Sequence, residues 1–108
     1  MARHRDEPAE ERAARVGEIV RRHIPVTAVV LFGSYAKGAE HEWSDLDVAV
    51  FTPVAEELSL DRQVDFDLEV HKAVGTDVQI IYLDAQDYPV PRQFSFAEEV
   101  LRGGKRVA

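Results

Sequence analysis

The chain has 108 residues, of which 45% are hydrophobic and 31% are charged, as in one ordinary globular domain. Cysteine is absent, which excludes a disulfide framework and a thiolate metal site. The formal net charge is −7: residues 1–23 hold six Arg and five acidic residues, whereas the remainder holds 7 basic and 15 acidic ones. Such an acidic body repels a phosphate backbone, so we expect no direct contact with nucleic acid. No apolar run reaches the length of a membrane span, and the first residues are charged, unlike a signal peptide. We therefore expect a cytoplasmic protein that does not contact a membrane.

The first half of the chain is predicted to form a helix followed by two strands. Residues 8–23 carry apolar side chains near a helical period, with Arg and Glu on the opposite face. Pro25 ends this helix, and the strand formers at 26–32 follow it. Residues 33–38 form a turn that leads into a short helix or loop. After a polar connection, a second strand covers residues 45–51.

The second half is predicted to contain two helices and one strand. A long helix covers residues 59–73, a strand covers 77–83, and a final helix covers 92–102. One face of the long helix carries Leu60, Val64, Leu68 and His71. The alternation of helices and strands predicts an α/β (α+β) fold, a small mixed sheet flanked by helices, with residues 1–108 forming a single domain.

Two acidic residues at the start of the second predicted strand are the main candidates for a metal site. Asp45 and Asp47 are separated by one residue, so in a strand both side chains point to the same face. Two carboxylates held side by side repel each other unless a cation lies between them. A pair of Mg²⁺ ions about 4 Å apart, bridged by carboxylates and substrate phosphates, is the usual reason for such an arrangement. Two acids placed by chance at a solvated strand edge are the alternative, but Asp is a poor strand former.

A Gly-Ser turn at the end of the first predicted strand is the candidate phosphate site. Gly33 and Ser34 lie where a strand passes into a helix, and backbone N–H groups there favour anions. The Ser34 hydroxyl adds a donor, and Lys37 adds a positive charge. A turn that uses Gly-Ser for its geometry alone is the alternative, but it does not explain the acidic pair downstream.

Asp77, which opens the third predicted strand, is the candidate third carboxylate. In a sheet that pairs this strand with the previous one, it would stand beside the acidic pair and act as general base on an attacking hydroxyl. A solvated acid at a strand start is the alternative, and Asp84, Asp65 and Asp67 are competing acids.

Residues 31–38 and 44–50 together resemble the signature of the DNA polymerase beta-like nucleotidyltransferase superfamily. The pattern of Gly-Ser, ten residues and Asp-x-Asp is complete. The resemblance extends over most of the chain, including the flanking helices, the third predicted strand and residues 96–104. Within the superfamily the chain looks most like the minimal nucleotidyltransferases of bacteria and archaea.

This resemblance implies transfer of a nucleoside monophosphate from a nucleoside triphosphate to a hydroxyl, with release of pyrophosphate. It implies that Gly33 and Ser34 hold the β,γ-phosphates and that Asp45 and Asp47 bind two Mg²⁺ ions. Asp77 matches the third acid, which orients the second metal and the nucleophile. In-line phosphoryl transfer depends on positioning and charge neutralisation, in agreement with this assignment.

The resemblance also implies a partner protein. Larger relatives carry a further domain that binds the acceptor, which this chain lacks, whereas many minimal members pair with a HEPN-domain toxin and serve as its antitoxin. We therefore expect transfer of AMP from ATP to a tyrosine of a HEPN toxin, in a hetero-oligomer with it. A non-catalytic antitoxin that neutralises its partner by binding is one alternative, favoured by the acidic body. A stand-alone enzyme acting on a small hydroxyl compound, with its pocket built in a homo-oligomer, is another.

Overall fold

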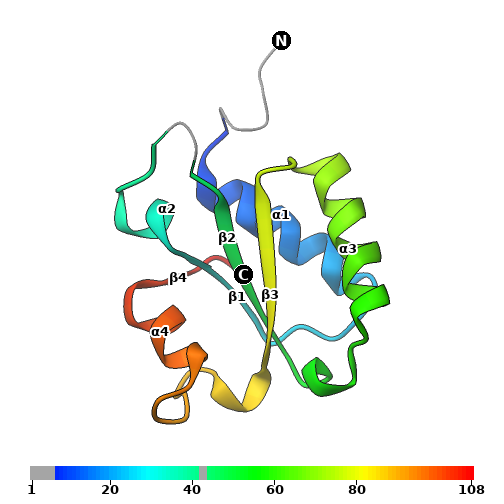
Figure 1. Cartoon of the computed structure of the whole chain (residues 1–108), viewed down its shortest axis with the longest axis vertical. Coiled ribbons are helices and arrows are strands. Elements are labelled where there is room, and N and C mark those ends of the chain that lie inside the picture. The colour runs from blue at the N-terminus through cyan, green and yellow to red at the C-terminus, as the bar shows by residue number, and fades with distance from the viewer. Residues whose placement is uncertain (1–6, 42–43) are drawn as a thin grey trace.

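A four-stranded sheet forms the centre of the structure, a computed structural model that describes residues 7–41 and 44–108 (Figure 1). The strands are β1 (Ala28–Phe32), β2 (Leu46–Thr52), β3 (Val78–Asp84) and β4 (Lys105–Arg106). Their order is β3-β2-β1-β4; β1 is antiparallel to β2 and β4, and β2 is parallel to β3. The predicted mixed sheet is confirmed. Positions 42 and 43 of the predicted polar connection lie outside the described residues.

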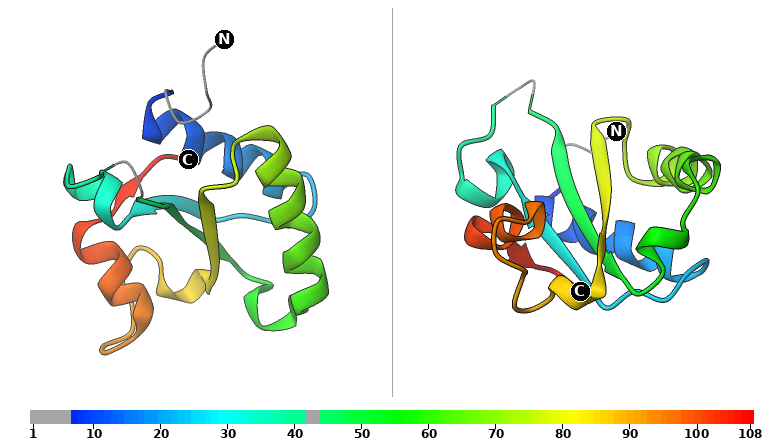
Figure 2. Two further views of the ribbon diagram at one scale, coloured as in Figure 1. Left: turned by 45° about the horizontal axis from the view of Figure 1, so that its top comes forward. Right: turned by 60° about the horizontal axis from the view of Figure 1, so that its bottom comes forward.

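Helices cover both faces of this sheet (Figure 2). Helices α1 and α3 pack on one face, α4 packs on the other, and the one-turn helix α2 follows β1. The helices are α1 (Ala9–Arg21), α2 (Ser34–Lys37), α3 (Leu60–Ala73) and α4 (Phe96–Gly103), with 3-10 turns η2 (Ala55–Glu57) and η3 (Ala85–Asp87). The two layers create two apolar cores with the sheet between them.

Strand β2 contributes side chains to both cores. Leu46, Val48 and Val50 belong to the core under α1 and α3, and Ala49 and Phe51 belong to the core under α4. The expected core side of Leu46, Val48 and Val50 is therefore confirmed. Burial on both faces explains why this segment is an almost continuous apolar run. By the same alternation, Asp47, near the start of β2, points to the α4 side of the sheet.

The last helix begins later than the sequence predicts. Phe94 has a positive φ of 63°, and Ser95 caps the helix by accepting a hydrogen bond from the Glu98 N–H at 3.2 Å. Arg92 is held outside the helix, because its guanidinium and its backbone N–H both donate to the Asp87 carboxylate. The predicted start at residue 92 was therefore wrong. The short strand β4 was also missed, since two residues carry no detectable alternation.

Helix α3 has the predicted bounds but presents an unexpected face. Ser59 caps it by accepting from the Arg62 N–H at 3.3 Å. Its buried residues are Phe66 and Val70. The apolar residues of the predicted face are exposed, by 77% for Leu60, 53% for Val64 and 54% for Leu68. Packing against the sheet thus uses a different side of the helix.

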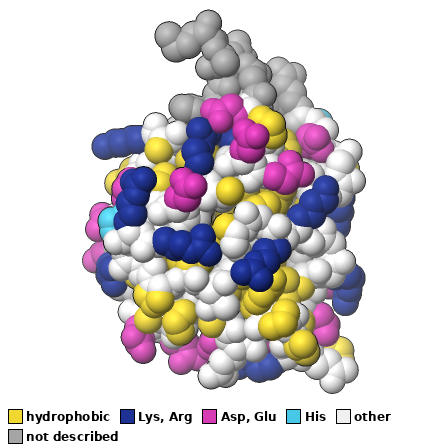
Figure 3. Space-filling view, turned by 180° about the vertical axis from the view of Figure 1, so that it is seen from behind, with side chains coloured by type: hydrophobic (Ala, Val, Ile, Leu, Met, Phe, Trp, Pro, Cys, Tyr) yellow, Lys and Arg dark blue, Asp and Glu magenta, His cyan; other side chains and the backbone are white. Residues whose placement is uncertain are grey.

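The outer surface mixes charges of both signs. On the rear face, Lys and Arg side chains are interspersed with Asp and Glu, and neither sign forms an unbroken field (Figure 3). Among the helices that the structure describes, each is too short or too polar to cross a membrane.

Candidate active site

Gly33 lies at the end of β1, where the chain turns into α2, and it contacts an acidic side chain of the next strand. Its φ is 74°, in the left-handed region that favours glycine, and a Cβ placed there would collide with Oδ2 of Asp47. The β1–β2 register pairs Phe32 with Asp47, which explains the contact. Gly33 therefore allows the Asp47 carboxylate to lie directly against the turn. The predicted turn and one acid of the predicted pair therefore lie in contact.

Asp45 and Asp47 interact electrostatically in this site. Asp47 is half-buried, and its pKa is raised first by burial and then by the negative charge of Asp45. Asp45 is exposed. In the part of the chain that the structure describes, neither carboxylate forms an ion pair with a Lys or Arg side chain. Two like charges without a cation of their own are suited to bind one from solution.

Gln79 of β3 is the third side chain beside this pair, and the sequence reasoning missed it. Its Nε2 donates to Oδ2 of Asp45 at 3.0 Å, and the parallel register places it opposite Asp47. A glutamine one position inside a strand carries no metal-site signal by itself. Only the β2–β3 register would have identified it.

Asp77 has a different environment from the one expected. Its carboxylate pairs with the guanidinium of Arg12 of α1, which is completely buried and also donates to the Val74 carbonyl at 3.5 Å. Its backbone carbonyl accepts from the Leu46 N–H at 2.9 Å, which joins β3 to the start of β2. Among residues 7–41 and 44–108, no group of three or more His, Cys, Asp or Glu side chains is arranged to hold a metal ion.

The structure therefore does not bring Asp77 into one cluster with Asp45 and Asp47. The physical reason is the buried Arg12, whose charge needs a counter-charge within reach. The competing acid Asp84 lies at the far end of β3, where it caps η3 by accepting from the Gln86 N–H at 2.9 Å. Asp65 is exposed on α3.

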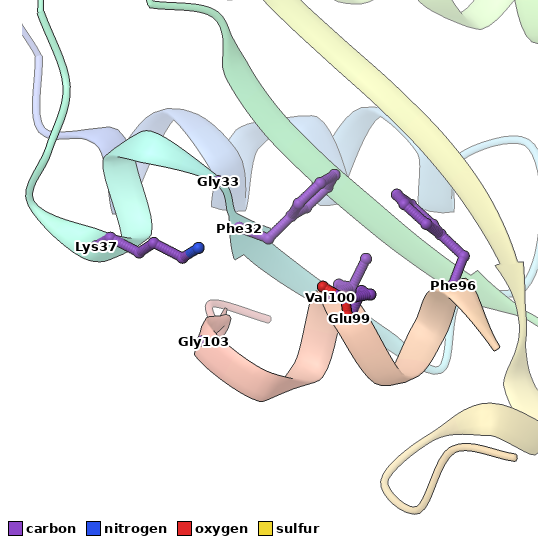
Figure 4. Close-up of a pocket in the computed structure, with 7 residues that line it drawn as sticks. All are labelled: Phe32, Gly33, Lys37, Phe96, Glu99, Val100 and Gly103. Atoms are coloured by element: carbon purple, nitrogen blue, oxygen red, sulfur yellow. The ribbon is translucent and has the colours of Figure 1, made fainter. Parts of the chain in front are cut away.

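A shallow pocket of about 160 Å³ lies beside the Gly33 turn, between α2 and α4. The rings of Phe32 and Phe96 border it and meet edge to face, with centroids 6.3 Å apart and planes at 86°. Lys37 extends from α2 into the same space (Figure 4). The structure thus places a positive charge near the turn. Ser34 is the first residue of α2, where backbone N–H groups have no partner within the helix.

Comparison with known proteins identifies the family. A family model described as nucleotidyltransferase domain matches residues 14–101. The chain belongs to this nucleotidyltransferase family. The chain is similar to a chain in a crystal structure described as a toxin–antitoxin with AMP-PNP. The match covers 92% of this chain and 72% of that chain, with 25% identity and a TM-score of 0.66. No curated protein matches the chain.

Two further solved structures are similar to this nucleotidyltransferase. A structure described as a candidate minimal nucleotidyltransferase has 25% identity and a TM-score of 0.58, covering 93% of this chain and 96% of that one. A tri-AMPylated HEPN toxin of Shewanella oneidensis in complex with its MNT antitoxin has 21% identity and a TM-score of 0.61, covering 93% and 71%. The resemblance to minimal nucleotidyltransferases and the expected fold are confirmed.

Proposed function

We propose that this nucleotidyltransferase transfers AMP from ATP to a tyrosine hydroxyl of a partner HEPN toxin, and thereby acts as its antitoxin. The observation that carries the proposal is the contact between the Gly33 turn and the Asp47 carboxylate, beside Asp45, with no Lys or Arg of the described residues in an ion pair with either acid. The similar structures described as containing AMP-PNP and a tri-AMPylated HEPN toxin support the choice of nucleotide and acceptor.

The donor set fits Mg²⁺ that arrives with the nucleotide. Mg²⁺ prefers oxygen ligands and is commonly held by one or two carboxylates together with substrate phosphates. Asp45 and Asp47 provide those carboxylates, and their mutual repulsion is relieved when the ion binds. The metal supplies charge neutralisation at the phosphates during the reaction. A titration with Mg²⁺ and a non-hydrolysable ATP analogue gives the number of ions, which we expect to be two.

The remaining roles follow from position. Gly33 lets a phosphate approach the backbone closely, and Ser34 and Lys37 add a hydroxyl donor and a positive charge near it. In the transfer, the tyrosine oxygen forms a bond to the α-phosphorus while the bond to pyrophosphate breaks, and the hydroxyl proton is lost. Asp77 acts on this site indirectly, because its backbone carbonyl accepts a hydrogen bond from the start of β2 and its carboxylate pairs with Arg12.

The test is a transfer assay with radiolabelled ATP and Mg²⁺, with and without a candidate HEPN partner, the product of the adjacent reading frame. We expect label on a tyrosine of the partner, and loss of that label with Asp47→Asn while the circular dichroism spectrum is unchanged. Glu18→Gln, which neutralises one exposed acid on α1, is the matched control and should keep full transfer. Transfer that survives Asp47→Asn would contradict the site.

A second function, neutralisation by binding alone, is favoured by one observation. Gln79, rather than a third carboxylate, lies beside Asp45 and Asp47, which reduces the negative charge available for metal. On this alternative the double variant Asp45→Asn/Asp47→Asn still protects cells that express the toxin. Loss of protection in the double variant would leave catalysis as the antitoxin activity.

A further inference from the structure

Helix α3 carries an apolar stripe that no described element covers. Leu60, Val64 and Leu68 are each more than half exposed. They are spaced by four residues, so they form one line along the helix surface. In the ribbon views of Figures 1 and 2, α3 lies at the outer side of the molecule and no other element lies beyond it.

The stripe is not required for the fold. Helix α3 is attached to the sheet by Phe66 and Val70 on another side. Single exposed apolar residues are common on soluble proteins, as at Val90 in the segment before α4. Three in line on one helix form a contiguous patch, which is typical of a protein–protein contact.

The edges of the stripe are acidic. Asp61 and Asp65 are exposed on one side, and the half-buried Asp67 lies on the other. Among the described residues, none of the three forms an ion pair, whereas Glu69 on the far side of the helix pairs with His23 at 2.7 Å and Arg22 at 3.8 Å. The stripe is therefore an apolar seam with unneutralised negative charges along it.

These negative charges favour one kind of binding partner for the stripe over another. If two copies of α3 packed antiparallel about Val64, the same edge of each helix would meet, and Asp61 of each copy would lie near Asp65 of the other, which places like charges together twice. A helix with its own apolar face flanked by Lys or Arg matches both the seam and its edges. We propose that α3 is the docking surface for a basic amphipathic helix of a partner protein.

The surface lies beside a groove that includes a neighbour of the acidic pair. A groove beside α3 is lined by Asp67 and His71 of the helix and by Thr76, Val78, Gln79 and Ile80 at the start of β3. Gln79 is the residue that bonds Asp45. A helix seated on α3 thus lies next to a groove whose lining includes Gln79, the residue that donates to Asp45. In naming the HEPN toxin as the protein that supplies this helix, the inference rests on the proposed function.

The test measures binding of the candidate HEPN partner, the product of the adjacent reading frame, to purified variants of this protein. The variant Leu60→Ser/Leu68→Ser removes the seam, and we expect its Kd to rise about tenfold or more. The variant Asp61→Lys/Asp65→Lys should also weaken binding, and added salt should weaken the wild-type complex but not this variant. The exposed Val90→Ser is the matched control and should bind as wild type does.

A photo-crosslinking residue at position 64 identifies the occupant. We expect crosslinks to a helical segment of the HEPN protein with Lys or Arg beside its apolar residues, and none from the same residue placed at position 90. Crosslinks to a second copy of this chain, no binding by the wild type, or unchanged binding by Leu60→Ser/Leu68→Ser would each overturn the inference. Asp47→Asn should bind normally, so a failure of catalysis is distinguished from a failure of docking.

Discussion

Asp77 and the pair Asp45 and Asp47 lie at the start of neighbouring parallel strands, yet their charges are balanced in different ways. Asp77 has a cation supplied by the fold, the buried Arg12. The pair has none among the described residues, and the two carboxylates repel each other enough to raise the pKa of Asp47 beyond the effect of its burial. One carboxylate is part of the folded framework, and the other two form no ion pair with Lys or Arg among the described residues.

This difference predicts that the two places respond differently to substitution. Removing a partner from a buried ion pair leaves an uncompensated charge and destabilises the protein. Removing one acid from an unneutralised pair relieves repulsion and, under the proposed function, takes away a metal ligand. Substitutions at the two places should therefore have opposite effects on stability and activity.

The largest expected effect is on catalysis, from substitution in the pair Asp45 and Asp47. Asp47→Asn should lower AMP transfer by about a hundredfold or more, because a lost metal ligand removes several kcal/mol of charge stabilisation. Initial rates of label transfer at saturating Mg²⁺ measure this change. An equal loss of transfer in the control Glu18→Gln would show that the effect is not specific to the pair.

The next largest effect is on the stability that depends on the ion pair between Arg12 and Asp77. Arg12→Met should lower the free energy of unfolding by about 3 kcal/mol, because it removes the buried guanidinium that pairs with the Asp77 carboxylate. Urea unfolding followed by circular dichroism measures it. The double variant Arg12→Met/Asp77→Leu should recover much of the loss. If the double variant is the less stable of the two, the ion pair is not what matters.

A smaller effect should follow from turning Gln79 into an acid. Gln79→Asp places a third carboxylate beside Asp45 and opposite Asp47, and we expect Mn²⁺, used as a probe for Mg²⁺, to bind about tenfold more tightly. Calorimetry with the metal alone measures this affinity. The isosteric Gln79→Glu should tighten binding in the same direction. Weaker binding in both variants would mean that Gln79 does not face the metal.

The smallest effect is on the stability of the metal-free protein. Because the pKa of Asp47 is raised in the folded state, folding favours its protonated form, and stability contributed by this group decreases as the pH rises above its unfolded value. Asp47→Asn should thus stabilise the metal-free protein at pH 7 by a few tenths of a kcal/mol. The gain should disappear when the pH falls below about 4. A destabilised Asp47→Asn protein at pH 7 would contradict this sign.

The sequence by itself determined the local parts of the site. A glycine with positive φ after a strand, and two acids one residue apart at the next strand start, are set by spacing along the chain, so the turn and the acidic pair were predictable. The elements around them followed from hydrophobic periodicity. Helix and strand order in turn predicted a mixed sheet flanked by helices.

Only the tertiary structure decided which charged groups are neutralised and which apolar face is covered. Arg12 and Asp77 are 65 residues apart, and Gln79 reaches Asp45 only through the β2–β3 register. The periodicity of α3 does not say which side meets the sheet, and packing chose Phe66 and Val70 while Leu60, Val64 and Leu68 stayed exposed. These contacts depend on strand register and on packing between elements. The order of residues along a single helix or strand does not determine either.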